Sequence, residues 1–286
     1  MSILPQRILE DKADLVIFDS NHLAHRALWT TGDLSHNGLP TGTLYGFVNQ
    51  VQSIRSLFSK SSILVFAWDS KNSLRKELYK EYKSQRKNAS TPEEITRKEA
   101  FYYQMEIIRQ EVMEPLGYMN HFKEEGFEAD DIIASLCLWA KNHPRKINAT
   151  WIVSSDHDLY QLLENATMFQ PHTKRNYNKE TLKKEWGVSP HQWSQVLAIA
   201  GCAGDGVPGV MGVGLSTASR YVLGEKIRPT QMVAIQRARR MIERNIKLVS
   251  LPFENRNLVP DNFNPQIHKD NPSGKRRVKE QFGFNI

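Results

Sequence analysis

Three short apolar runs, far apart in the chain, each lead directly into aspartate. Runs of this length are typical of strands buried on both faces. Because α/β proteins bind ligands just outside the carboxyl ends of their strands, acids at these positions are candidates for ligand binding. Asp19 taken alone is explained equally well as a helix N-cap, but the repetition favours a site. The runs cover residues 15–18, 63–68 and 151–155, and the acids that follow them are Asp19, Asp69, Asp156 and Asp158.

Asp156 and Asp158 flank a histidine at the end of the third run. Side chains two residues apart on a strand project to the same side, so both carboxylates can reach one cation. His157 would point away from them, and we interpret it as structural.

A second acidic feature opens the apolar segment 126–136, where Glu128, Asp130 and Asp131 stand within four residues. The positive end of a helix macrodipole favours acids there, which accounts for one or two of them. Glu128 and Asp131 share a helix face, and carboxylates this close repel one another unless they are protonated or bridged by a cation. We therefore favour a divalent-metal site over a solvated helix start.

Residues 71–98, which we call the basic arm, contain nine Lys or Arg against four Glu, with Tyr79 and Tyr82 interleaved. Cations for phosphates and rings for bases are what a path for single-stranded nucleic acid requires. The alternative is a solvated, salt-bridged helix. Near the end of the arm, Thr91-Pro92-Glu93-Glu94 predicts a capping box that opens a helix reaching about Met113.

A glycine-rich turn, residues 201–214, separates predicted helices at 189–200 and 216–223. Closely spaced glycines allow the backbone to approach a ligand, and the amides at the next helix start suit a phosphodiester. Asp205 within the turn adds a further acid to the set. The remaining expected elements are helices over 21–29 and 43–58, a helix from Leu159 and a strand over 166–170.

Composition sets broad limits on a chain of 286 residues with net charge +7. The basic balance points mildly to a polyanionic partner. Cys137 and Cys202 are too few for a disulfide framework, and no segment approaches the ~18 apolar residues of a membrane span. We expect a reducing, cytoplasmic setting. From Glu254 onward we expect a loosely structured basic tail, in which Lys275-Arg276-Arg277 is either an auxiliary phosphate contact or a solvated end.

In this order, these motifs resemble the 5′-nuclease superfamily, which includes the 5′-3′ exonuclease domains of family A DNA polymerases and stand-alone phage flap endonucleases. The resemblance runs from about Asp14 to Leu251. It rests on the segments Ile17-Phe18-Asp19, Pro40-Thr41-Gly42, Leu74-Arg75-Lys76-Glu77, Glu81-Tyr82-Lys83, Glu128-Ala129-Asp130-Asp131, 158–163 and Val207-Pro208-Gly209-Val210.

The resemblance implies an α/β fold with a central, mainly parallel sheet, flanking helices, a basic helical arch and a helix-three-turn-helix region. We expect a nuclease core over 1–185 including the arch at about 71–98, a helix-three-turn-helix DNA-binding region over 186–253, and a polar basic tail over 254–286.

The same resemblance implies the site. Its acids would converge on two Mg²⁺ or Mn²⁺ ions, which prefer hard oxygen ligands. Lys83 and Arg86 would contact the scissile phosphate, Arg75 would contact nucleic acid, and Tyr82 would stack on a base. Gly209, Gly212 and Gly214 would grip duplex phosphates, and the carbonyls around Val210 and Val213 would hold K⁺. The expected metal ligands are Asp19, Asp69, Glu128, Asp130, Asp131, Asp156, Asp158 and Asp205.

One position departs from the family pattern, because Cys202 stands where a second acid is common, three residues before Asp205. Soft sulfur is a poor Mg²⁺ ligand. Our hypothesis is that the second metal, shared by Asp156, Asp158 and Asp205, binds more weakly in this chain.

The resulting expectation is a monomeric, structure-selective 5′-3′ exonuclease or flap endonuclease of the bacterial or phage-infected cytosol. It would cut DNA, and RNA primers as a further substrate, at 5′ ends, flaps or single-strand/duplex junctions, leaving a 5′-phosphate and a 3′-hydroxyl. The alternatives are a ribonuclease with a related acidic pocket and a non-catalytic or weakly active junction-binding protein.

Overall fold

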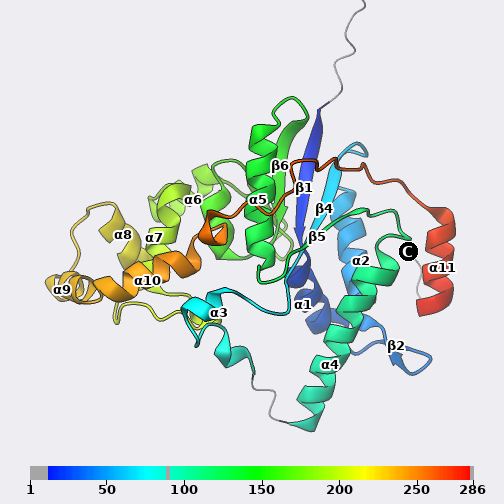
Figure 1. Cartoon of the computed structure of the whole chain (residues 1–286), viewed down its shortest axis with the longest axis horizontal. Coiled ribbons are helices and arrows are strands. Elements are labelled where there is room, and N and C mark those ends of the chain that lie inside the picture. Colours follow the sequence, from blue (N-terminus) through cyan, green and yellow to red (C-terminus); the bar gives the residue numbers. More distant parts are fainter. Residues whose placement is uncertain (1–11, 88–90, 284–286) are drawn as a thin grey trace, which may run out of the picture.

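One six-stranded sheet forms the centre of the molecule, with helices on both of its faces (Figure 1). The computed structural model describes residues 12–87 and 91–283, without the side chains of residues 86 and 87. The strand order is β5-β4-β1-β6-β7-β8; the first five strands are parallel and β8 is antiparallel to β7. This confirms the expected mainly parallel sheet. The strands are β1 (Ala13–Asp19), β4 (Ile63–Trp68), β5 (Asn120–Lys123), β6 (Ile147–Val153), β7 (Thr167–Gln170) and β8 (Arg175–Tyr177).

Strand β1 lies at the centre of the sheet and divides its side chains between two cores. Leu15 and Ile17 face one apolar cluster, and Val16 and Phe18 face the other, as the two-residue period of a strand requires. Burial on both faces explains why the strands read as unbroken apolar runs instead of alternating ones.

One face of the sheet is covered by four helices (Figure 1): α1 (Ser20–Thr31), α2 (Gly42–Arg55), α4 (Pro92–Ile107) and α11 (Pro272–Phe282). The predicted capping box forms at the start of α4, and the helix continues as a π-helical turn through Ile108–Val112. The loop between α1 and α2 contains a short hairpin of β2 (Ser35–His36) and β3 (Leu39–Pro40).

The opposite face is covered first by α5 (Ala129–Asn142), and its core continues into a helical region beyond the sheet (Figure 1). Trp193 is fully buried there, and its indole N–H donates to the His157 carbonyl at 2.7 Å. The helix expected from Leu159 is a short 3₁₀ turn, His157–Leu162. The helices of this region are α6 (Lys179–Trp186), α7 (Pro190–Ala200), α8 (Leu215–Val222), α9 (Pro229–Arg237) and α10 (Arg239–Val249).

The basic arm enters this framework through a single helical turn, α3 (Arg75–Leu78), and a 3₁₀ turn, Ser84–Lys87. Residues 88–90 of the arm lie outside the described residues. In the described part, the expected helical arch therefore consists of these short turns and the first half of α4.

The C-terminal segment is more ordered than expected, and the expectation of a loose tail is wrong for residues 272–282. Gly274, Val278 and Phe282 recur at helical spacing and are the buried residues of α11. Upstream, Phe263 packs against Phe122 and Trp139, so the segment crosses the sheet edge before α11 joins the first face. The helix was not predicted because the segment is mostly polar and only Gly274, Val278 and Phe282 form its buried stripe.

No helix in residues 12–87 and 91–283 is both long and apolar enough to cross a membrane.

Candidate active site

The predicted acids meet where the central strands end. Because β4, β1 and β6 are neighbouring parallel strands, the residues that follow them share one edge of the sheet. Asp69 accepts a 2.8 Å hydrogen bond from the Ala129 amide and so joins this edge to the start of α5. Asp19 accepts a 2.7 Å hydrogen bond from Ser154, whose hydroxyl also receives the Asp156 amide at 3.1 Å. Three parallel apolar strands thus place their carboxylates at the same edge of the sheet.

Electrostatic repulsion links these carboxylates to one another. Burial raises the pKa of Asp130 well above its ordinary value, and the charges of Asp156 and Asp19 raise it further. Burial, followed by Asp156 and Asp205, raises the pKa of Asp158 to about 7. Burial is also the main cause that raises the pKa of Asp69 to about 6. Acids held in this way are stabilised by a cation among them.

Glu128 differs from these acids because two cations reach it. Burial disfavours its charged form, but Lys83 and Arg75 outweigh that effect and hold its pKa below the ordinary value. The Lys83 ammonium lies 2.9 Å from Glu128 Oε2 and 3.7 Å from Asp205 Oδ2. Lys83 has a left-handed φ of 53°, and its amide donates to the Asp205 carbonyl at 2.7 Å, so the arm is attached to the glycine-rich turn at this residue.

Tyr82 does not have the role expected of it. Its side chain is 3% exposed, which leaves no ring face for a nucleobase. Its hydroxyl oxygen lies 2.9 Å from both Glu128 Oε2 and Asp205 Oδ2. Tyr82 therefore holds two candidate ligands at a common position, and the prediction that it stacks on a base is wrong.

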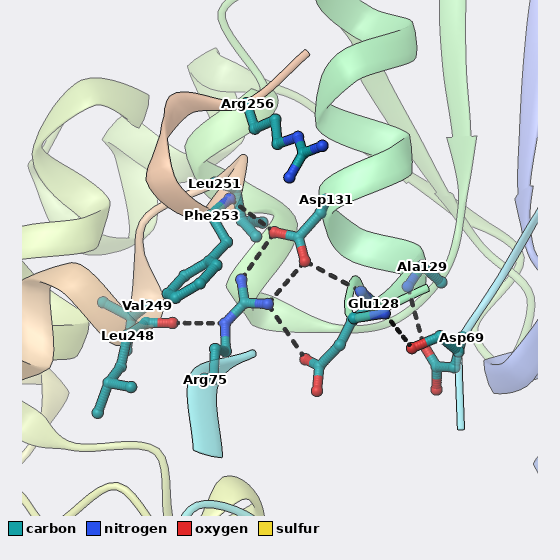
Figure 2. Close-up of polar contacts among 12 residues, drawn as sticks. Asp69, Arg75, Glu128, Ala129, Asp131, Leu248, Val249, Leu251, Phe253 and Arg256 are labelled. Atoms are coloured by element: carbon teal, nitrogen blue, oxygen red, sulfur yellow. Dashed lines mark hydrogen bonds and ion pairs between the residues drawn. The ribbon is translucent and has the colours of Figure 1, made fainter. Parts of the chain in front are cut away.

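Asp131 is one of the expected metal ligands, but its carboxylate is fully buried and already occupied (Figure 2). Its Oδ2 accepts from the Arg75 guanidinium at 2.6 Å and from the Glu128 amide at 3.0 Å. Its Oδ1 accepts from the same guanidinium at 2.7 Å and from the Phe253 amide at 2.7 Å. Four donors saturate the carboxylate, which corrects the expectation: Asp131 is a structural acid.

The expectation that Arg75 contacts nucleic acid is also corrected. Arg75 is paired with Asp131 and is only 2% exposed. Arg86 lies in the 3₁₀ turn Ser84–Lys87, and its side chain lies outside the described residues. Its predicted role therefore stays a prediction.

The glycines of the turn have different tasks. A Cβ at Gly209 would lie 1.9 Å from the Ala200 carbonyl oxygen, so this glycine allows the turn to pack on the end of α7. Gly212 has a left-handed φ of 73°, and Gly214 precedes α8; no atom lies within 4 Å of a Cβ at either position. Of the three glycines expected to grip phosphates, Gly212 and Gly214 therefore have open space beside their backbone, as Gly204 earlier in the turn also has. The side chains of Val210 and Val213 are buried.

Cys202 faces the acids as a thiol. Its Sγ lies 3.7 Å from Asp158 Oδ1, and burial together with the charges of Asp158 and Asp205 raises the pKa of the thiol above its ordinary value. The protonated sulfur can donate a weak hydrogen bond to Asp158 but offers no thiolate to a metal.

Three residues of the site carry no strong sequence signal. Ser154 connects Asp19 with Asp156, as described above, and the Asn21 side chain accepts the Asp69 amide at 3.0 Å. Asn245 is fully buried and donates to the carbonyls of Ala198 and Pro208, at 3.0 and 2.7 Å, which ties α10 to the turn. Ser154 and Asn21 each lie next to an acid at a strand end, and this position is the sequence signal that could have indicated their role. Asn245 has no such signal, because its partners are 37 and 47 residues away.

The donor set fits a hard divalent cation, since seven carboxylates remain once Asp131 is set aside and the one sulfur beside them, that of Cys202, is a protonated thiol. Among the described residues, no three His, Cys, Asp or Glu side chains are already arranged around one metal position. The fit thus rests on the chemistry of the donors and on their mutual repulsion.

Comparison with known proteins identifies the class. Residues 14–187 match the family described as 5′-3′ exonuclease, N-terminal resolvase-like domain, and the chain belongs to this family. It is 32% identical over 224 residues to a thermostable DNA polymerase I of Thermus thermophilus, covering 78% of this chain and 25% of the relative. DNA polymerase I of Mycobacterium leprae is 31% identical over 220 residues, with 74% and 23% covered. The chain thus spans about a quarter of the length of these relatives.

Solved structures share the fold. The T5 5′-exonuclease with bound zinc has a TM-score of 0.67 at 23% identity, covering 84% of this chain and 90% of that one. A T5 D15 flap endonuclease in a pseudo-enzyme-product complex with DNA and metal ions has a TM-score of 0.66 at 22% identity, with 84% and 89% covered. The catalytic core of Rad2 in complex with DNA substrate has a TM-score of 0.57 at 13% identity, with 96% and 88% covered.

Proposed function

We propose that this chain is a divalent-metal-dependent, structure-selective 5′ nuclease that acts on DNA at 5′ ends, flaps and single-strand/duplex junctions. The observation that carries the proposal is the convergence of six carboxylates at the ends of β4, β1 and β6 and the start of α5, which Asp205 joins from the glycine-rich turn. Membership of the 5′-3′ exonuclease family supports the same reaction class.

Seven carboxylates would hold the metal, with two Mg²⁺ or Mn²⁺ ions as the expected complement. When bound, such ions supply a hydroxide at neutral pH and stabilise charge on the attacking and leaving oxygens. Asp131 is left out of the set because Arg75 and two backbone amides saturate it. The proposed ligands are Asp19, Asp69, Glu128, Asp130, Asp156, Asp158 and Asp205.

The chain's own cations would act on the phosphate. Lys83 has its ammonium at the edge of the carboxylate cluster, and we assign it to the scissile phosphate together with Arg86, to offset charge that builds up in the transition state. Hydrolysis would leave a 5′-phosphate and a 3′-hydroxyl. Tyr82 acts indirectly by fixing Glu128 and Asp205.

Duplex DNA would be held by the later part of the glycine-rich turn, beyond Asp205. Gly212 and Gly214 leave backbone open to phosphates, and contacts of this kind position a duplex without reading its sequence. We further propose that carbonyls around Val210 and Val213 hold K⁺ there. RNA primers as a second substrate, action as a monomer and a cytoplasmic setting are parts of the proposal that come from the sequence.

A 5′-labelled flap substrate tests the proposal directly. With Mg²⁺ we expect a short 5′-phosphorylated product, and with EDTA we expect binding without cleavage. Cleavage that proceeds in EDTA would contradict metal dependence. A protein that binds the flap but never cuts it would be the junction-binding alternative, and one that cuts only single-stranded RNA would be the ribonuclease alternative.

A further inference from the structure

Arg75 lies where three parts of the chain meet (Figure 2). It belongs to α3 at the start of the basic arm, and its partners come from α5 and from the end of α10. Its Nε donates to the Leu248 carbonyl at 2.8 Å, and its two terminal nitrogens donate to Asp131. One of these nitrogens also lies 3.6 Å from Glu128 Oε2.

Asp131, the partner of Arg75, also contacts the segment that follows α10. Asp131 accepts the Phe253 amide, and the Phe253 ring lies 4.7 Å from the Arg75 guanidinium carbon. Glu128 is tied to Asp131 through its own amide. The segment 248–253 and the Glu128 carboxylate are therefore held by one buried ion pair.

A direct role of Arg75 at a DNA phosphate does not fit this geometry. The side chain is 3% exposed, and turning it outward would leave the Asp131 carboxylate buried without its counter-ion. The planar fork of arginine matches a carboxylate with two parallel hydrogen bonds, which lysine cannot reproduce.

The contacts continue beyond the pair to the glycine-rich turn. Asn245, one turn before Leu248 on α10, donates to the carbonyl of Ala198 near the end of α7 and to the carbonyl of Pro208 within that turn. A chain of buried contacts thus runs from the glycine-rich turn through α10 and Arg75 to Glu128.

We propose that Arg75 is a positioning residue that holds the Glu128 carboxylate in a fixed relation to the end of α10, and so to the glycine-rich turn. This inference rests on the proposed function, because it takes the turn as the duplex grip and Glu128 as a metal ligand. Arg75 itself touches neither the metal nor the reacting phosphate.

The test is the variant Arg75→Lys, which keeps the charge and loses the fork. We expect flap affinity in Ca²⁺ to stay within about 3-fold of the parent, while the single-turnover rate at saturating DNA falls about 10- to 100-fold, the loss that an ångström of misplacement causes. Mn²⁺ half-saturation, followed by electron paramagnetic resonance without DNA, should rise severalfold. Arg109→Lys, which alters an ion pair between the π-helical turn and Glu106 at the end of α4, should leave all three values unchanged.

A loss of flap affinity above about 10-fold with an unchanged saturated rate would make Arg75 a DNA contact and overturn the proposal. If Arg75→Lys does not fold, Phe253→Leu removes the ring from the guanidinium without exposing a charge. It should slow the saturated rate about 3- to 10-fold at unchanged affinity, and an unchanged rate would refute the coupling. If the parent protein cuts no flap, the proposed function fails, and the Mn²⁺ measurement still decides the role of Arg75.

Discussion

Asp130 and Asp131 are adjacent residues with opposite surroundings. Asp131 has a guanidinium and two amides around it, so its charge is compensated within the protein. For Asp130, burial, Asp156 and Asp19 raise the pKa, and Lys83 opposes them only in part. A desolvated carboxylate whose charge is only partly compensated is costly in a fold, and such groups cluster at functional sites. At the level of single residues, this contrast separates a metal-ligand candidate from a structural acid.

The raised pKa values predict how the metal-free protein responds to pH. Asp158 has an ordinary value of 3.8 and a folded value of about 7, so the folded state binds more protons across that interval. The free energy of unfolding should therefore fall as pH rises from about 4 to 7, and the loss should be complete above the folded value. Thermal melts in EDTA across this range measure it.

Asp158→Asn removes that loss and should raise the metal-free melting temperature at pH 8 by about 2–5 °C, the order that one to two kcal/mol produces. The exposed Asp261→Asn is the matched control and should not shift the melt. If the melting temperature of Asp158→Asn equals that of the parent at pH 8, burial and the neighbouring carboxylates do not destabilise the charged form of Asp158.

Cys202 supports a second prediction at this scale. The protonated thiol beside Asp158 offers metal no charge, so Cys202→Asp should lower the Mg²⁺ concentration for half-maximal cleavage by several-fold. Titrating Mg²⁺ against flap cleavage measures the shift. The idea fails if half-saturation is the same in the variant and the parent.

Among the elements, the glycine-rich turn has one part that is fixed by packing and another part that is open to a ligand. Gly209 sits against the end of α7, and Asn245 closes the turn from α10. The turn is thereby rigid at its base and open at Gly212 and Gly214. A rigid base of this kind suits a grip that positions duplex phosphates.

The difference in packing between Gly209 and Gly214 can be measured by substituting each glycine with alanine. Gly209→Ala places a Cβ 1.9 Å from backbone oxygen and should destabilise the protein by about 3 kcal/mol or more, the upper end of overpacking. Gly214→Ala meets no atom within 4 Å and should stay within ~0.5 kcal/mol of the parent. Denaturant unfolding compares them, and equal stabilities would contradict the packing role of Gly209.

At the scale of the whole molecule, the sequence predicts the parts of the site that depend on single strands. An apolar run followed by aspartate specifies both a buried strand and an acid at its end, so this pattern alone places Asp19, Asp69 and Asp156 together. It does not assign the roles of Arg75, Asp131 and Tyr82, because residue type alone does not choose between DNA and a buried partner. Arg75 meets partners 56 and 173 residues away, which only the packed chain brings together.

The structure of the C-terminal tail was also not predicted from the sequence. Its composition is polar and basic, yet Val278 and Phe282 close the first core and Phe263 covers the sheet edge. A few apolar residues at the correct spacing outweigh composition when a core remains to be completed.

The carboxylates at the strand ends are proposed to form a metal centre that cuts DNA and is separate from the DNA grip at Gly212 and Gly214. The most direct test of this claim compares Asp130→Ala and Asp156→Ala with the parent protein in single-turnover flap cleavage and in flap binding. We predict that cleavage falls by ~100-fold or more, the loss expected for a principal electrostatic group, while binding persists. Variants that retain cleavage within ~10-fold of the parent would contradict the claim.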